Sequence, residues 1–157
     1  MGGGGRARRR HMKRILVGVD GSEPSDRAVE LAAELAGPVK AQVTVAHVIN
    51  PLAYPLDAYP AALVDPEVTA AVAQQERRVA EAVTSAAAER LRGKGLAVET
   101  LLLTGNPPLE LAESAERGGF DLVAVGSNGK GALRRMLLGS TSDRLVRLSK
   151  RPVLVVH

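Results

Sequence analysis

Cysteine is absent from all 157 residues of the sequence, and so is tryptophan. Without cysteine the chain can form no disulfide bond, thiolate nucleophile or thiolate metal site, as is usual in a reducing compartment. Aromatic residues make up only 2% of the chain, so valine, leucine and alanine must fill its core. No apolar run approaches the ~20 residues that a membrane-spanning helix needs, and no apolar stretch follows the N-terminus as in a secretory signal. We therefore expect a cytoplasmic protein without a membrane partner.

The basic character of the chain is confined to its N-terminal end. Residues 1–12 contain four arginines and no acidic residue, and the remaining 17 basic residues balance the 17 acidic ones. We interpret residues 1–12 as a disordered basic leader and residues 13–157 as a single domain. A basic arm can bind nucleic-acid phosphates. No aromatic residues are interleaved with it for base stacking, so we expect no specific nucleic-acid partner.

Short apolar runs alternate with helical periodicities along the chain, which is typical of consecutive βαβ units. Five of these runs predict strands, at residues 15–19, 43–48, 96–103, 122–125 and 153–156. Capping and stop signals predict four helices, at Ser22 to Gly37-Pro38, Asp65-Pro66 to Arg92, Asn106-Pro107 to Gly118-Gly119, and from Gly139-Ser140 onward. The second helix is expected to carry one apolar stripe, composed of Val68, Val72, Val79, Val83 and Ala86.

This order of elements predicts one α/β domain with a doubly wound, Rossmann-like parallel sheet of five strands and helices on both faces. Right-handed crossovers favour the strand order 3-2-1-4-5. The order reverses between the first and fourth strands, and ligands of such sheets bind at that switch point, beyond the carboxyl ends of the strands. We therefore expect a ligand site after residues 15–19 and 122–125.

Two glycine-bearing segments follow the fourth predicted strand. They are Gly126-Ser127-Asn128-Gly129-Lys130-Gly131 and Gly139-Ser140-Thr141-Ser142-Asp143. Glycine permits positive φ and lets a backbone approach a ligand closely, successive N–H groups in such turns can converge on an anion, and a helix N-terminus offers further unpaired donors. Each residue alone could equally belong to a flexible turn or, for Ser140, to a helix cap. Together the two segments predict a site that holds a polyphosphate from two sides.

The spacing Gly-x2-Gly-x9-Gly-Ser, formed by Gly126, Gly129, Gly139 and Ser140, resembles that of the universal stress proteins in their ATP-binding branch. The resemblance covers residues 13–157. Its motifs are the opening segment 15–22 (ILVGVDGS), His47-Val48, Gly105-Asn106-Pro107, the segment 121–127 (DLVAVGS) and the closing segment 151–156 (RPVLVV).

This resemblance implies an ATP site. The residues themselves offer no paired carboxylates with a positioned base, so we assign no catalytic residue. Contacts with the phosphates and ribose are expected after the fourth strand and at the start of the last helix, from Val125, Gly126, Asn128, Gly129, Gly131, Gly139, Ser140, Thr141 and Ser142. The adenine and ribose are expected against the ends of the first two strands, at Gly18, Val19, Asp20 and Val48. Asp20 would bind the nucleoside or help to hold Mg²⁺ or Mn²⁺ near the phosphates.

Some of these positions have a second interpretation. Asp20 can instead cap the turn that follows its strand. Position 128 is often basic or an imidazole in relatives, and that charge is lost with Asn128. Lys130 and Arg134 either replace it or are solvated charges on a loop. The tyrosines of the proline-rich loop at residues 49–64 form either a lid over the nucleotide or a cover for the sheet edge.

Other nucleotide-binding and catalytic motifs are absent. The chain has no Gly-x4-Gly-Lys-Ser/Thr, so it is not a P-loop NTPase, and the order of its glycines does not fit Gly-x-Gly-x-x-Gly. It also lacks a Gly-x-Ser-x-Gly nucleophile elbow. The three histidines do not form a metal-binding constellation by spacing. His47 ends an apolar strand and is expected to be a partly buried structural residue.

We therefore interpret the chain as a nucleotide-dependent sensor or regulator in a stress response, and not as an enzyme. Relatives form homodimers, often through the last strand, and residues 153–156 are a short apolar edge that would otherwise need protection. Two alternatives stay open: a slow ATPase or phosphoryl-transfer enzyme, and a structural dimerisation module with an empty cleft. The sequence does not distinguish ATP from AMP or a cyclic nucleotide.

Overall fold

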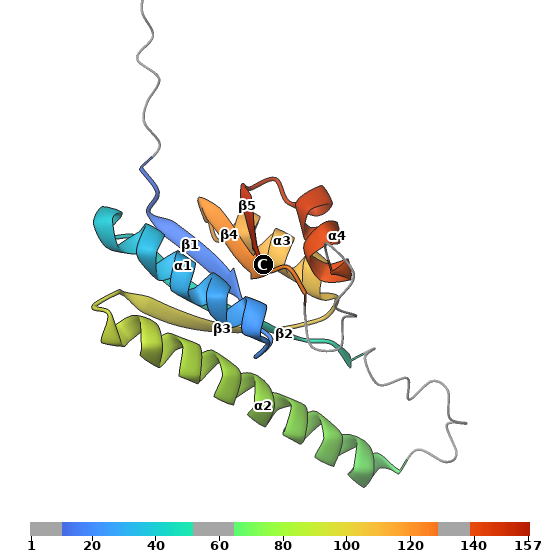
Figure 1. The fold of residues 1–157 in the computed structure, drawn as a ribbon. Coiled ribbons are helices and arrows are strands. Elements are labelled where there is room, and N and C mark those ends of the chain that lie inside the picture. The colour runs from blue at the N-terminus through green and yellow to red at the C-terminus, as the bar shows by residue number, and fades with distance from the viewer. Residues whose placement is uncertain (1–10, 52–64, 129–138) are drawn as a thin grey trace, which may run out of the picture.

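The computed structural model describes residues 11–51, 65–128 and 139–157. Their elements are β1 (Arg14–Gly18), α1 (Glu23–Val39), β2 (Gln42–Ile49), α2 (Pro66–Gly93), β3 (Val98–Thr104), α3 (Pro107–Arg117), β4 (Leu122–Gly126), α4 (Ser140–Leu148) and β5 (Val153–Val156). The strands form one parallel sheet in the order β3-β2-β1-β4-β5 (Figure 1). The predicted doubly wound fold and its strand order are thus confirmed. The division into leader and domain stays a prediction.

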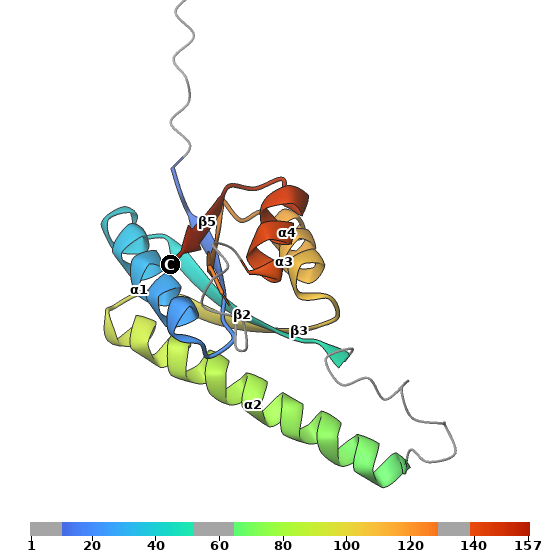
Figure 2. The same ribbon diagram turned by 45° about the vertical axis from the view of Figure 1, so that its right-hand side comes forward.

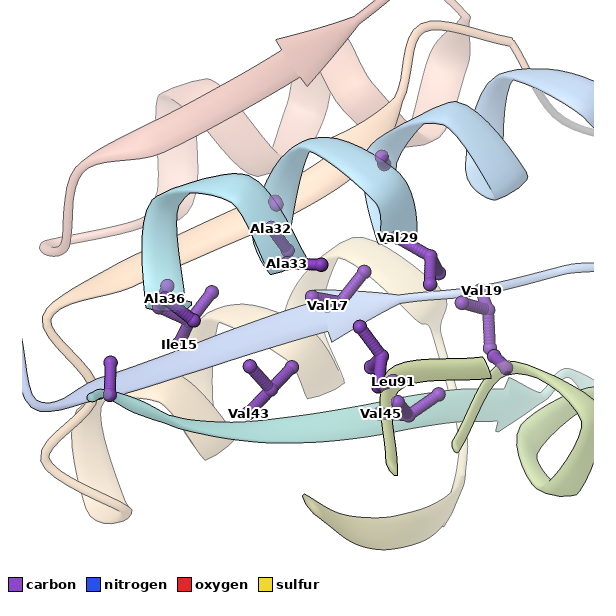
Figure 3. Packing of buried hydrophobic residues seen from close by; sticks show 14 residues of the cluster. Ile15, Val17, Val19, Val29, Ala32, Ala33, Ala36, Val43, Val45 and Leu91 are labelled. Carbon is purple, nitrogen blue, oxygen red and sulfur yellow. The ribbon is translucent and has the colours of Figure 1, made fainter. Parts of the chain in front are cut away.

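Two hydrophobic cores hold the helices against the two faces of the sheet. α1 and α2 cover one face, and α3 and α4 cover the other, as the turned view shows (Figure 2). In the first core Val17 of β1 packs with Leu91 of α2 and with alanines of α1, whose small side chains let that helix lie close to the strands (Figure 3). In the second core Leu16 of β1 packs with Leu111 of α3 and Leu145 of α4.

Helix α1 begins at its predicted cap and ends beyond its predicted stop. Ser22 Oγ accepts a hydrogen bond from the Ser25 N–H over 3.3 Å. The helix continues through Pro38, because a proline in the last turn removes one N–H donor but keeps a helical φ. It ends at Lys40, whose left-handed conformation (φ 54°) turns the chain toward β2.

Helix α2 buries a different stripe from the one that the sequence predicts. Val68 and Val79 belong to the predicted stripe but are 58% and 39% exposed. The buried stripe lies about a third of a turn further round the helix. It consists of Ala80, Thr84, Ala87, Ala88 and Leu91. The prediction was wrong for Val68 and Val79, whereas Val83 of the predicted stripe is partly buried and packs against the first core. Small alanines on the buried stripe let the helix lie close to the sheet.

The carboxyl ends of β1, β2 and β4 meet at one edge of the sheet, with β1 between the other two. After β1 the chain enters α1 on one face, whereas α4 follows β4 on the opposite face (Figure 2). This divergence opens a crevice at the edge. Among the described residues, no helix has the length and apolar character needed to cross a membrane.

Candidate functional site

A cavity of about 400 Å³ lies at this edge of the sheet. The carboxyl ends of β1, β2 and β4 form its floor, the first turns of α3 and α4 line it from one face, and a side chain of α2 reaches it from the other. Every described residue that the sequence assigned to the nucleotide site lines this cavity. These residues are Gly18, Val19, Asp20, Val48, Val125, Gly126, Asn128, Gly139, Ser140, Thr141 and Ser142.

Several predicted features cannot be placed in this cavity. Gly129 and Gly131, assigned to the phosphates, lie outside the described residues, as do Lys130 and Arg134. Tyr54 and Tyr59 lie outside them as well. The roles suggested for these residues therefore stay predictions.

The end of β4 and the start of α4 are joined directly by hydrogen bonds. The Gly139 N–H donates to Ser127 O over 2.6 Å, and Ser142 Oγ donates to the same carbonyl over 2.8 Å. Ser127 and Ser142 are both 2% exposed, so losing one of these buried bonds would leave a polar group without water to replace its partner. The two segments that the sequence expected to converge do so at their described residues.

Gly126 and Gly139 are required by the packing of the protein itself. A Cβ at position 126 would lie 2.6 Å from the Pro24 carbonyl carbon and the Ser25 nitrogen of α1, and one at position 139 would lie 2.9 Å from Ser127 O. Neither glycine has a positive φ. The sequence predicts that both glycines provide backbone freedom and close approach to a ligand. In the structure their lack of a side chain lets β4 lie against α1 and α4, which brings three backbones to the rim of one cavity. Their role toward a ligand stays a prediction.

Helix α4 presents an uncapped N-terminus to the cavity. Its N-cap residue is Gly139, which has no side chain, and not Ser140. The Asp143 N–H makes the first helical hydrogen bond, to Gly139 O. The N–H groups of Ser140, Thr141 and Ser142 therefore have no acceptor within the helix. All three residues line the cavity, and such a helix end favours an anion.

The turn after β1 is held by Asp20 and Ser22. Asp20 Oδ1 accepts a hydrogen bond from the Ser22 N–H over 2.9 Å, and Ser22 Oγ donates to Asn128 O over 3.3 Å. Asp20 therefore stabilises its own turn and also lines the cavity. The two roles are compatible, because a carboxylate can accept several hydrogen bonds.

The Asn128 side chain presents an amide to the same region. Its Oδ1 is buried and accepts no hydrogen bond from the described part of the chain. An asparagine amide can be turned over to present either its oxygen or its NH₂ group. Asn128 can therefore accept from a ligand or donate to it, although it supplies no charge.

The wall between β1 and β2 forms where the pairing of these strands stops. Their last backbone hydrogen bond runs from the Val19 N–H to Ala46 O over 2.8 Å. The Val19 carbonyl accepts from His47 Nδ1 over 2.7 Å, which places a proton on Nδ1 because a carbonyl can only accept. His47 is partly buried, as the sequence predicts. Val48 follows beyond the last backbone bond and lines the cavity.

Sequence reasoning missed several residues of the cavity. Glu76 reaches it from α2, Pro107 and Leu111 from α3, and Asn50 from beyond the end of β2. Glu76 and Asp20 are the carboxylates among the described lining residues, which include no lysine or arginine. No motif signals Glu76, because its position depends on where α2 crosses the sheet edge. Leu111 could have been found from the apolar periodicity of α3.

The donor set of the cavity fits a metal ion only together with a ligand. No group of three or more histidine, aspartate or glutamate side chains in the described ranges could hold a metal. Mg²⁺ is usually bound through one or two carboxylates together with the phosphates of a nucleotide. Asp20 lines the cavity and can be one such carboxylate.

Comparison with known proteins identifies the family of this fold and cavity. Residues 11–157 match the family model of the universal stress proteins. The chain belongs to the universal stress protein family. It is 30% identical over 145 residues to the universal stress protein YxiE of Bacillus subtilis, which covers 92% of this chain and 98% of that protein. It is also 35% identical over 148 residues to a universal stress protein of Mycolicibacterium smegmatis. That protein is longer, and the chain spans 47% of its length.

Solved structures of this family share the fold. The structure of protein MJ0577 of Methanocaldococcus jannaschii is similar with a TM-score of 0.81 and 26% identity, covering 93% of this chain and 96% of that one. A universal stress protein solved in complex with cAMP is similar with a TM-score of 0.66 and 28% identity, covering 94% and 98%.

Proposed function

We propose that this universal stress protein binds ATP in the cavity, with the phosphates at the start of α4 and the nucleoside at the ends of β1 and β2. The observation that carries the proposal is the uncapped N-terminus of α4, whose first three residues border the same cavity as the end of β4. Backbone N–H groups at such a helix end favour an anion without help from side chains. The similar protein solved with cAMP supports an adenine nucleotide as the class of ligand.

The charges of the cavity support this orientation. Glu76 belongs to α2, which covers the sheet face opposite to α4. A phosphate charge about 4 Å from a carboxylate costs about 4 kcal/mol at an effective dielectric constant of about 20. The polyphosphate is therefore favoured away from Glu76 and toward α4. Asp20 would bind the nucleoside, or bind a Mg²⁺ or Mn²⁺ ion that accompanies the phosphates and offsets the like charges.

We infer that the role of the bound nucleotide is regulatory. Three segments around the cavity are tied to one another, by Ser22 Oγ to Asn128 O and by Gly139 and Ser142 to Ser127 O. A ligand that contacts all three segments stabilises this arrangement in proportion to its binding free energy. A partner in a stress response could then distinguish the occupied from the empty protein.

Titration calorimetry with ATP, ADP, AMP and cAMP, each with and without Mg²⁺, tests the binding site. ATP is expected to bind more tightly than AMP, because its two additional phosphates reach the start of α4. Mass spectrometry of any nucleotide released on denaturation is an independent test. A protein that binds none of these nucleotides contradicts the proposal, whereas a preference for AMP or cAMP keeps the site and changes the ligand.

The enzyme alternative is tested on the same preparation by measuring ATP turnover with Mg²⁺ or Mn²⁺. We expect slow turnover or none. Rates of about 1 s⁻¹ or faster are typical of enzymes and would replace the regulatory interpretation.

We also propose that β5 pairs with β5 of a second copy. It is an edge strand of the sheet, and its four apolar residues are all partly exposed. Val123 donates to Pro152 O and Ser127 donates to Val156 O, so even-numbered residues of β5 face β4. Val155 then directs its backbone groups to the open edge, where an unpaired strand can bind another chain.

Val155→Pro tests this pairing, because it removes an outward N–H and keeps the bonds to β4. Analytical ultracentrifugation is expected to find a dimer for the wild type and a monomer for the variant, with unchanged circular dichroism. A monomeric wild type at micromolar concentration would reject the pairing.

A further inference from the structure

The side chain of His47 takes the acceptor that would otherwise extend the pairing of β1 with β2. The Gln42 N–H donates to Lys13 O, and Ala46 O accepts from the Val19 N–H, each over 2.8 Å. Even-numbered residues of β2 therefore direct their backbone groups toward β1. The next bond of this series would run from the Val48 N–H to Val19 O.

That bond is missing from the described part of the chain, and Val19 O accepts from His47 Nδ1 over 2.7 Å instead. Val19 is 6% exposed, and a buried carbonyl without a partner would cost free energy comparable to a lost hydrogen bond. The imidazole satisfies this carbonyl without using the Val48 N–H. A side-chain donor has thus replaced a backbone donor at the last position of the ladder.

As a consequence, the backbone N–H and C=O of Val48 lie beyond the last hydrogen bond between β1 and β2, which joins Val19 to Ala46. Val48 lines the cavity together with Val19 and His47. An adjacent backbone N–H and C=O match the edge of adenine, where the N1 acceptor lies beside the N6 amino donor. An extended ladder would use the N–H and close this edge of the cavity.

We propose that His47 is a positioning residue for the nucleoside: by occupying Val19 O, it keeps the N–H and C=O of Val48 available to the base. This inference rests on the proposed nucleotide function. The proposal gives His47 a functional role, in addition to being a partly buried, hydrogen-bonded residue at the end of an apolar strand.

Three substitutions separate this role from a general effect on folding. His47→Leu removes the donor, so that the Val48 N–H becomes the group best placed to satisfy Val19 O. His47→Asn restores a nitrogen donor at the same number of bonds from the backbone as Nδ1. His47→Gln places its amide one bond further away and is the matched control for His47→Asn.

The first readout is amide hydrogen exchange, followed by NMR on the ligand-free protein. The Val48 N–H is expected to exchange rapidly in the wild type and in His47→Asn. In His47→Leu it is expected to slow by about tenfold or more, because it joins the ladder. Unchanged exchange of Val45 and Ala46 shows that β2 is intact. A Val48 N–H that is protected in the wild type, or equally rapid in His47→Leu, would overturn the proposal.

The second readout compares ATP with inorganic tripolyphosphate, which has no base. His47→Leu is expected to lose about tenfold in ATP affinity, close to the net contribution of one hydrogen bond, and to keep its tripolyphosphate affinity within about twofold. Asparagine should restore ATP affinity and glutamine should not. An equal loss for both ligands would indicate a structural effect and reject the role. If the wild type binds neither ligand, the proposed function fails and the role toward the nucleoside fails with it. The exchange measurement then still decides whether His47 keeps the Val48 N–H out of the ladder.

Discussion

The cavity has two walls that are constructed differently. The α4 wall, formed by residues 126–128 and 139–142, is fixed by glycines in close contact with other backbones and by buried hydrogen bonds to Ser127 O. The β1–β2 wall exists because a ladder stops early, with the His47 side chain at the stop and Glu76 reaching in from α2. Packing holds the first wall, whereas side chains define the second. Changes in the first should therefore lower stability and binding together, and changes in the second should alter binding alone.

The largest effect is expected from Gly126→Ala in the α4 wall. The new Cβ would lie 2.6 Å from two backbone atoms of α1, so either β4 or α1 must move. Overpacking of this kind lowers the free energy of unfolding by roughly 1–3 kcal/mol, and ATP affinity should fall with it. Urea unfolding followed by circular dichroism, together with calorimetry, measures both quantities.

Gly93→Ala is the matched control for this substitution. Gly93 is the last residue of α2, and apart from its chain neighbours and its own helix a Cβ there would meet no atom within 4 Å. Alanine should raise the free energy of unfolding by about 0.5–1 kcal/mol, because it reduces the freedom of the unfolded chain. If the two alanine variants behaved alike, close packing would not be the reason for glycine at position 126.

A smaller effect is expected from Gly139→Ala, because φ is −73° and suits alanine. Its Cβ would lie 2.9 Å from Ser127 O and 3.3 Å from Asn128 Cα, and alanine is also a poor N-cap. We expect a loss of about 1 kcal/mol in stability. Affinity for ATP and for tripolyphosphate should fall together by about tenfold, because the donors at the start of α4 move. Loss of ATP affinity with tripolyphosphate affinity intact would assign this wall to the base.

The two walls also differ in how far the sequence could predict them. The spacing of Gly126, Gly139 and Ser140 was enough to predict which residues form the α4 wall. The spacing locates the site even when the structural reason for each glycine is unknown. The reason itself was not predictable, because the contact of Gly126 with Pro24 joins residues far apart in the chain. The strand order followed from the alternation of apolar runs and helical patterns, since few topologies satisfy right-handed crossovers.

The β1–β2 wall depends on register, which local patterns do not specify. The free edge at Val48 exists because β1 pairs with β2 only as far as Val19 and Ala46, so the sequence could identify His47 only as a partly buried residue. Glu76 was hidden for a related reason. The valines of α2 indicated one buried stripe, and alanines formed another, so the sequence misjudged which side of α2 faces the sheet.

The smallest effect, of opposite sign, is expected from Glu76→Gln in the β1–β2 wall. A unit charge about 10 Å from the phosphates in water-like surroundings contributes about 0.4 kcal/mol, or about twofold in affinity. ATP affinity should therefore rise about twofold at low salt, and the gain should fade near 0.15 M salt, where the Debye length is about 8 Å. Glu89→Gln, an exposed carboxylate on the same helix outside the cavity, should change nothing. Neither variant should alter the free energy of unfolding by more than about 0.5 kcal/mol.

The contrary outcome would be that Glu76→Gln lowers the affinity for ATP and leaves the affinity for tripolyphosphate unchanged. Glu76 would then bind the nucleoside directly, and this wall would recognise the ligand through side chains as well as through the backbone of Val48.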